Sequence, residues 1–285
     1  MLETAQGVPA QEYGHPTRTE EFPVPAPDPS SRRWPWKLSA LLLAAAAVTA
    51  GLATYLFWLP CRGSMLRGSF LFPVGTGSEF SDACLVQMDT GTPFPFLADG
   101  AHQTWSSSQV AGVSIVLAAL AWLPPAFGLG WRQRTRAALS LPVLATLLLA
   151  AATFPVARST GFDSGSPGAV WLWLSVEVAG VAAVLAVGRW EPAAGGGTLV
   201  QLLALSWGTT AFGLVHQLFD YSFMITTSDS NWDVPPGTGY GTSAVLALSG
   251  VLTVLICLRR RPAALTKPPA GRPDRGLTLV DAPHR

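Results

Sequence analysis

The chain has 285 residues, of which 49% are hydrophobic and only 12% are charged, and its formal net charge is +1. Soluble proteins carry about 25% charged residues, so this composition excludes an ordinary water-soluble fold for most of the chain. It predicts instead that the lipid bilayer is the main partner. A net charge so close to zero gives no reason to expect nucleic acid as a partner.

Six apolar segments are long enough, or nearly long enough, to cross a membrane. An α-helix needs about 20 residues to span a hydrocarbon core of about 30 Å. The predicted spans are residues 38–59, 110–129, 137–156, 169–187, 199–219 and 243–258. The last is the shortest and makes a full crossing only if residues 240–242 join it. The sequence therefore predicts an all-α integral membrane protein, a bundle of six transmembrane helices with an extracytoplasmic loop that contains a disulfide.

Basic and acidic residues gather on opposite sides of the predicted spans. One side holds Arg32, Arg33, Lys37, Arg132, Arg134, Arg136, Arg189, Arg259, Arg260 and Arg261. The other holds Glu79, Asp82, Asp89, Asp99, Asp163, Asp220, Asp229 and Asp233, against only Arg62, Arg67 and Arg158. Because loops rich in lysine and arginine stay in the cytoplasm, the first side is predicted to be cytoplasmic. We expect a multi-pass protein of the plasma membrane with both termini in the cytoplasm.

The first apolar segment has one alternative interpretation, a cleaved signal peptide, because basic residues precede it. Its apolar run is longer than the usual signal-peptide core of about 7–15 residues, and a long N-terminal extension comes before it. A membrane anchor is therefore the favoured interpretation. Cleavage would leave five spans and the same side for the C-terminus.

The regions outside the spans form two tails and two outer loops. Residues 1–37 and 259–285 are rich in proline and lack apolar periodicity, which is typical of disordered segments. Between these predicted cytoplasmic tails, the membrane domain at 38–258 has a long outer loop at 60–109 and a second one at 220–239. The inner loops are short. Most of the extramembrane bulk is thus expected on the extracytoplasmic face.

Two of the three cysteines, Cys61 and Cys84, fall in the first outer loop. That compartment is oxidising, so the sequence predicts a disulfide between them. It would close a loop of about two dozen residues and stabilise the fold by roughly 3 kcal/mol. The spacing is wider than that of catalytic dithiols, which favours a structural role. Cys257, at the inner end of the last span, is expected to be a buried apolar residue, with palmitoylation as the alternative.

Two short motifs resemble functional ones, but the residues around them argue against a catalytic or a channel function. The tripeptide at 89–91, Asp-Thr-Gly, occurs once, whereas aspartic peptidases need two carboxylates that share a proton, so we predict a turn. The segment at 237–241, Gly-Thr-Gly-Tyr-Gly, is similar over five residues to the selectivity filter of potassium channels. However, Pro235 and Pro236 leave no room for the pore helix of that family. We expect a flexible loop that enters the last span.

Glu177 lies about midway along the fourth predicted span. A charged group there costs roughly 2.5 kcal/mol or more, so the side chain must face the bundle interior, stay protonated or pair with another group. A carboxylate inside a membrane is a candidate functional residue. The alternative is a protonated acid that is hydrogen-bonded to a neighbouring helix as a structural contact.

His216 and Asp220 are four residues apart, which places them on one face near the outer end of the fifth span. An aspartate that orients a histidine is a common arrangement for handling protons. His102 could join the two at a metal, but a plain hydrogen bond is favoured, and no metal or cofactor is predicted. Counting the rise along straight helices places the Glu177 carboxylate roughly 6–10 Å deeper than His216, which disfavours direct pairing and leaves a water-bridged relay open.

No assembled catalytic constellation accompanies these residues, since the chain has no His-Glu-x-x-His motif, phosphate-binding loop or close cysteine pair. The leading hypothesis is a non-enzymatic membrane protein, either transport-related or a subunit of an envelope complex. A membrane-protein partner or a homo-oligomer would fit it. The alternatives are an envelope membrane enzyme with His216 and Asp220 at its outer face, and a sensor that needs a cytoplasmic partner.

Overall fold

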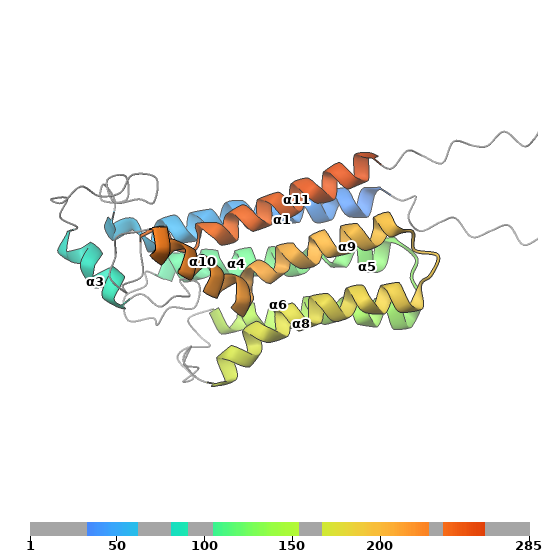
Figure 1. Cartoon of the computed structure of the whole chain (residues 1–285), viewed down its shortest axis with the longest axis horizontal. Helices are drawn as coiled ribbons and strands as arrows, with labels where there is room; N and C mark the ends of the chain where they lie inside the picture. Colours follow the sequence, from blue (N-terminus) through green and yellow to red (C-terminus); the bar gives the residue numbers. More distant parts are fainter. Residues whose placement is uncertain (1–32, 62–80, 91–104, 154–166, 228–235, 260–285) are drawn as a thin grey trace, which may run out of the picture.

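The computed structural model describes residues 33–61, 81–90, 105–153, 167–227 and 236–259. Over these ranges the regular elements are all helical, and the long helices lie side by side in a bundle (Figure 1). The elements are α1 (Trp34–Phe57), η2 (Leu59–Cys61), α3 (Asp82–Thr90), α4 (Trp105–Leu120), α5 (Leu123–Gly128), α6 (Gln133–Thr153), α8 (Pro167–Trp190), α9 (Gly196–Thr209), η3 (Thr210–Phe212), α10 (Leu214–Thr227) and α11 (Tyr240–Arg259).

Five helices of the described ranges are long and apolar enough to cross a membrane. They are Trp34–Phe57, Ser107–Gly128, Gln133–Ala152, Val170–Trp190 and Tyr240–Arg259. A sixth crossing requires that the pair Gly196–Phe212 and Leu214–Thr226, bent by 65°, be counted as one span. The all-helical fold is thus confirmed. The last helix begins at Tyr240, where the sequence required it to begin for a full crossing.

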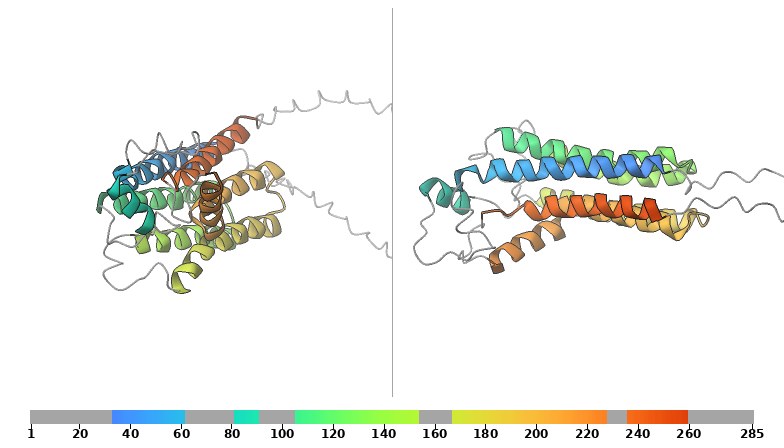
Figure 2. Two further views of the ribbon diagram at one scale, coloured as in Figure 1. Left: turned by 60° about the vertical axis from the view of Figure 1, so that its left-hand side comes forward. Right: turned by 90° about the horizontal axis from the view of Figure 1, so that it is seen from above.

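The bundle packs its helices through small side chains. α1 lies against α4 and α11, α6 lies against α4 and α8, and α9 lies against α8 and α11 (Figure 2). Alanines occupy many of the fully buried positions at these contacts, among them Ala46, Ala50, Ala118 and Ala183. Where two such alanines meet, the helix backbones can approach closely and gain dispersion energy, while larger side chains such as Trp36, Trp122 and Leu43 fill the rest of the core.

The outer surface of the bundle is apolar, unlike that of a soluble protein, and buried hydroxyl groups link its helices. Serine hydroxyls point inward and join helices, as where Ser114 Oγ donates to the carbonyl of Ala46 at 2.7 Å and Ser39 Oγ to that of Ala121 at 2.7 Å. Large apolar side chains face outward, including Leu41, Val48, Leu144, Val181, Leu185 and Val251. An outer surface of this kind suits lipid and is rare on water-soluble monomers.

Prolines shape two of the predicted spans differently. The second span consists of α4 and α5, because Pro124 stands at the start of α5 after a turn at residues 121–122. Proline fits a first helical turn, where its missing N–H would have no partner. Pro142 instead lies inside the continuous helix α6.

The fifth predicted span differs most from the sequence expectation. It does not run as one helix over 199–219, because the chain breaks at Gly213 between η3 and α10. Residues 220–227, which we expected in the second outer loop, are helical and continue α10. Likewise α3 and the beginning of α4 lie within the predicted loop 60–109.

Several predictions concern segments that the structure does not describe. Most of the two predicted cytoplasmic tails, at 1–32 and 260–285, falls outside the described residues. So do the middle of the first outer loop, which holds His102, and residues 228–235 of the second. Those predictions therefore stay predictions.

Candidate functional site

The candidate site is built on the break in the fifth apolar segment. Gly213 is extended (φ −82°, ψ 166°), and α10 leaves the direction of α9 and η3 by 65°. The first N–H groups of any helix lack partners one turn earlier in the chain. At this break the amides of Val215 and His216 therefore need acceptors from elsewhere.

Glu177 supplies the acceptor from the neighbouring helix α8. Its Oε1 accepts a hydrogen bond from the backbone N–H of Val215 at 2.8 Å, and the N–H of His216 also interacts with this carboxyl. A carboxylate at a helix N-terminus is favoured by the partial positive charge that the aligned peptide dipoles place there. Glu177, a residue of α8, thus caps the N-terminus of the neighbouring helix α10.

Glycine at position 213 makes this contact possible. A Cβ atom there would lie 2.5 Å from Oε1 and 2.7 Å from Cδ of Glu177. Such distances are far below van der Waals contact, so a larger residue would displace the carboxyl. The break and the carboxylate are therefore one structural unit.

Asp220 forms a second unit of the same kind at the start of α11. Its Oδ2 accepts a hydrogen bond from the N–H of Gly239 at 2.8 Å, and the N–H of Gly241 also interacts with this carboxyl. A Cβ on Gly241 would lie 2.7 Å from Cγ of Asp220. Gly237 and Gly239 have φ values of +97° and +107°, which glycine adopts readily. The described residues of the filter-like segment thus form a turn into α11.

Gln217 makes hydrogen bonds across the break, from α10 to η3 and to α11. Its Nε2 donates to the carbonyl of Ala211 in η3 at 2.6 Å and to Oγ1 of Thr242 in α11 at 2.8 Å. The Thr242 hydroxyl in turn lies 3.3 Å from the same carbonyl of Ala211. A carbonyl left without a helical partner by the break is thereby satisfied, and α10 is joined to α11.

His216 and Asp220 have different surroundings in the structure. The carboxylate of Asp220 contacts the backbone before α11, while Nε2 of His216 is buried and has no hydrogen-bond partner among the described residues. No three His, Cys, Asp or Glu side chains of the described ranges converge as metal ligands. His102, the third predicted ligand, lies outside those ranges.

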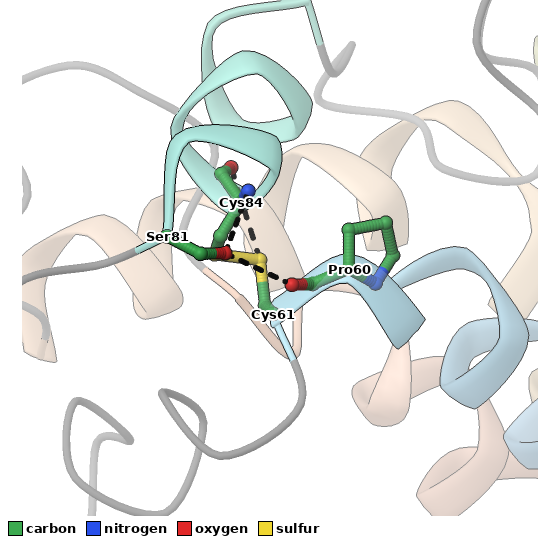
Figure 3. The surroundings of a disulfide bond; sticks show 4 residues. All are labelled: Pro60, Cys61, Ser81 and Cys84. Atoms are coloured by element: carbon green, nitrogen blue, oxygen red, sulfur yellow. Dashed lines mark hydrogen bonds between the residues drawn. A yellow bond between two sulfur atoms is a disulfide. The ribbon is translucent and has the colours of Figure 1, made fainter.

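Cys61 and Cys84 are joined by a disulfide in the structure, which is compatible with the prediction. It ties the end of α1 to α3, and Ser81 supports it by accepting the N–H of Cys84 at 3.2 Å and donating to the carbonyl of Pro60 at 3.2 Å (Figure 3). Tyr221 of α10 packs against the buried cluster around this bond. The cap formed by η2 and α3 therefore contacts α10, the same helix whose N-terminus binds Glu177.

Sequence reasoning missed three members of this site: Gly213, Gln217 and Thr242. Gln217 carried a signal, since an amide in an apolar segment must find partners. The contact of Glu177 with α10 was missed for another reason. Counting along straight helices separated the two in depth, and the 65° bend at Gly213 changes that geometry.

Comparison with known proteins does not assign this arrangement. No protein-family model matches the chain, and no curated protein or solved structure matches it. Its class is indicated by the helices themselves, whose lengths and apolar surfaces suggest a multi-pass membrane protein. The chemistry available at the site is that of two carboxyl groups, Glu177 and Asp220, each held against backbone N–H groups at the start of a helix.

Proposed function

We propose that the chain is a multi-pass protein of the plasma membrane with both termini in the cytoplasm. Charge supports this orientation, because the described basic residues of the predicted cytoplasmic side lie near one end of the bundle, where α1 begins and α11 ends (Figure 1). They are Arg33, Lys37, Arg132, Arg134, Arg136, Arg189 and Arg259. The disulfide cap lies at the opposite end, which agrees with an oxidising compartment there.

Within that frame we propose a transport-related function, exercised alone or as a subunit of an envelope complex. The observation that carries it is the break at Gly213, with the carboxyl of Glu177 bound to the N-terminus of the second half of the segment, α10. Secondary transporters bind substrates and coupling ions at broken helices, whose ends offer free backbone groups. In membranes, irregular backbone occurs only where protein covers it or a cavity adjoins it.

The proposed role of Glu177 is to exchange a proton. In its charged form the carboxylate holds the amide of Val215 by a charge-assisted hydrogen bond, which is roughly twice as strong as a neutral one. In its protonated form the same contact weakens, so α10 is held less firmly on α8. Proton binding at Glu177 would thereby be coupled to movement of α10 and of the outer cap that rests on it.

The test uses purified protein in liposomes that contain a pH-sensitive dye. With a potassium diffusion potential imposed, the wild-type protein should admit protons faster than protein-free vesicles, and Glu177→Gln should abolish the difference. Glu191→Gln is the matched control, because Glu191 follows the other end of α8 and binds the hydroxyl of Thr135. Equal flux in wild type and Glu177→Gln would remove Glu177 from any transport role.

A complex subunit is distinguished by native purification and mass spectrometry. If wild-type flux does not exceed that of empty vesicles, a stoichiometric membrane partner should co-purify, and its absence would overturn the proposal as a whole. The enzyme alternative has less support, because the Asp220 carboxylate is already bound to the backbone of Gly239.

A further inference from the structure

α10 turns several large apolar side chains outward, while Gln217 and Asp220 are buried against the bundle. Val215, Leu218, Phe219 and Phe223 are 65, 45, 67 and 44% exposed, whereas Gln217 and Asp220 are 4 and 6% exposed. The four exposed side chains follow helical spacing and so form one ridge, and the rings of Phe219 and Phe223 are stacked with centroids 6.4 Å apart. We call these four residues the α10 ridge.

The length of the fifth segment places this ridge near a membrane boundary. With 14 residues in α9 and 3 in η3, a rise of about 1.5 Å per α-helical and 2.0 Å per 3-10 residue gives about 27 Å. That is short of the hydrocarbon thickness of about 30 Å. A crossing that starts at Gly196 therefore ends along α10, which at its 65° inclination adds only about 9 Å in the same direction.

The composition of the α10 ridge fits lipid better than protein. Protein interfaces are enriched in aromatic residues, phenylalanine included, and in arginine, and they carry a polar rim. The ridge consists of aliphatic side chains and phenylalanine, and the exposed residues of α10 include no charged side chain. α10 also packs against α8, whose own outward residues Val178 and Val181 are apolar, so the two apolar surfaces adjoin.

We propose that α10 is an interfacial helix whose ridge of Val215, Leu218, Phe219 and Phe223 is covered by lipid of the outer leaflet. It lies at the boundary between acyl chains and headgroups, where amphipathic helices bury their apolar face by about 5–10 Å. Its polar face is turned to the protein, where Gln217 and Asp220 bind the broken ends of η3 and α11. This assignment rests on the proposed membrane location.

The test is nitroxide accessibility in vesicles of phosphatidylcholine and phosphatidylglycerol. Single cysteines replace Phe219 or Phe223 in the Cys257→Ser protein, with the Cys61–Cys84 disulfide intact. Oxygen concentrates in lipid and a neutral nickel chelate in water, so both positions should collide more often with oxygen. Leu185→Cys on α8, 67% exposed, is the lipid reference, and Ala193→Cys in the turn before α9 is the water reference.

Each outcome decides between distinct conclusions. High nickel accessibility at Phe219 and Phe223, with the lipid pattern kept at Leu185, would overturn the ridge assignment and leave the membrane location standing. Low access to both reagents at the ridge would mean that protein covers it, a second copy or a partner, and would also overturn the assignment. A water pattern at Leu185 would overturn the membrane location itself. If the Phe219 variant does not fold, the accessibility measured at position 223 tests the assignment by itself.

Discussion

The carboxyl group of Glu177 occupies the space that a side chain at position 213 would need. Its Oε1 lies 2.8 Å from the N–H of Val215, and a Cβ on Gly213 would come within 2.5 Å of that oxygen. Glu177 is on α8 and Gly213 lies in the break between η3 and α10, and neither can change without affecting the other. This relationship makes the coupling between α8 and the broken fifth segment measurable.

Gly213→Ala should displace Glu177 from the start of α10 and destabilise the protein. Overpacking of this kind costs about 1–3 kcal/mol, which the midpoint of thermal unfolding in detergent will report through tryptophan fluorescence. The control is Gly196→Ala, because no atom lies within 4 Å of a Cβ built on Gly196. In a Glu177→Ala background the same Gly213→Ala change should cost less. Strict additivity of the two changes would contradict the contact.

The long apolar helices and the proximity of Cys61 and Cys84 were predictable, because apolar length and cysteine position are local properties of the sequence. The break was not. Gly208 and Gly213 both lie in the fifth predicted span, yet Gly208 remains inside α9 while Gly213 ends η3. The difference is that α8 presents a carboxyl group beside Gly213, and that is a tertiary contact which no local pattern contains.

The acceptor on Glu177 and its charge should have separable effects. Glu177→Gln keeps an oxygen for the N–H of Val215 but loses the charge that strengthens the bond, so its unfolding midpoint should lie between those of the wild type and of Glu177→Leu. Glu177→Leu removes the acceptor and leaves N–H groups unpaired, which costs about 1–3 kcal/mol for each such group in a dry environment. Equal midpoints for the Gln and Leu variants would show that the cap contributes nothing to stability.

Asp220 should act on α11 rather than on His216. Asp220→Leu removes the acceptor for Gly239 and should cost about 1 kcal/mol, as for loss of a helix cap, with faster hydrogen exchange at residues 236–242. His216→Ala should leave that exchange unchanged, because the structure shows no hydrogen bond to its buried Nε2 from the described residues. If the two variants showed the same hydrogen-exchange profile, that result would instead support a direct interaction between His216 and Asp220.

Reduction should loosen the outer cap. Both cysteines of the disulfide are fully buried, and the ring that it closes stabilises the fold by roughly 3 kcal/mol in the chain-entropy model. A phosphine reductant should therefore lower the unfolding midpoint of the wild type but not that of a Cys61→Ser, Cys84→Ser double variant. Cys257→Ser serves as the control, since Cys257 is a free cysteine and its variant should respond to reductant as the wild type does.

The number of spans depends on whether the bent fifth segment crosses the membrane. Basic residues stand both before α1 and at the end of α11, and the positive-inside bias puts both on one side, which requires an even number of crossings. With five straight spans, α9 and α10 must then supply the sixth. A re-entrant segment would return to its starting side and would place the two basic ends on opposite sides.

Reporter fusions decide this point. Alkaline phosphatase, active only outside the cytoplasm, should be active when fused after Thr227 and inactive after Gly195 or after Arg261. Green fluorescent protein, fluorescent only inside, should give the reverse pattern. Cytoplasmic reporters after both Gly195 and Thr227, with an external one after Arg261, would establish five crossings and a re-entrant segment. That result would contradict the packing of Tyr221 in α10 beside the disulfide cap, and the charge argument would have failed at α11.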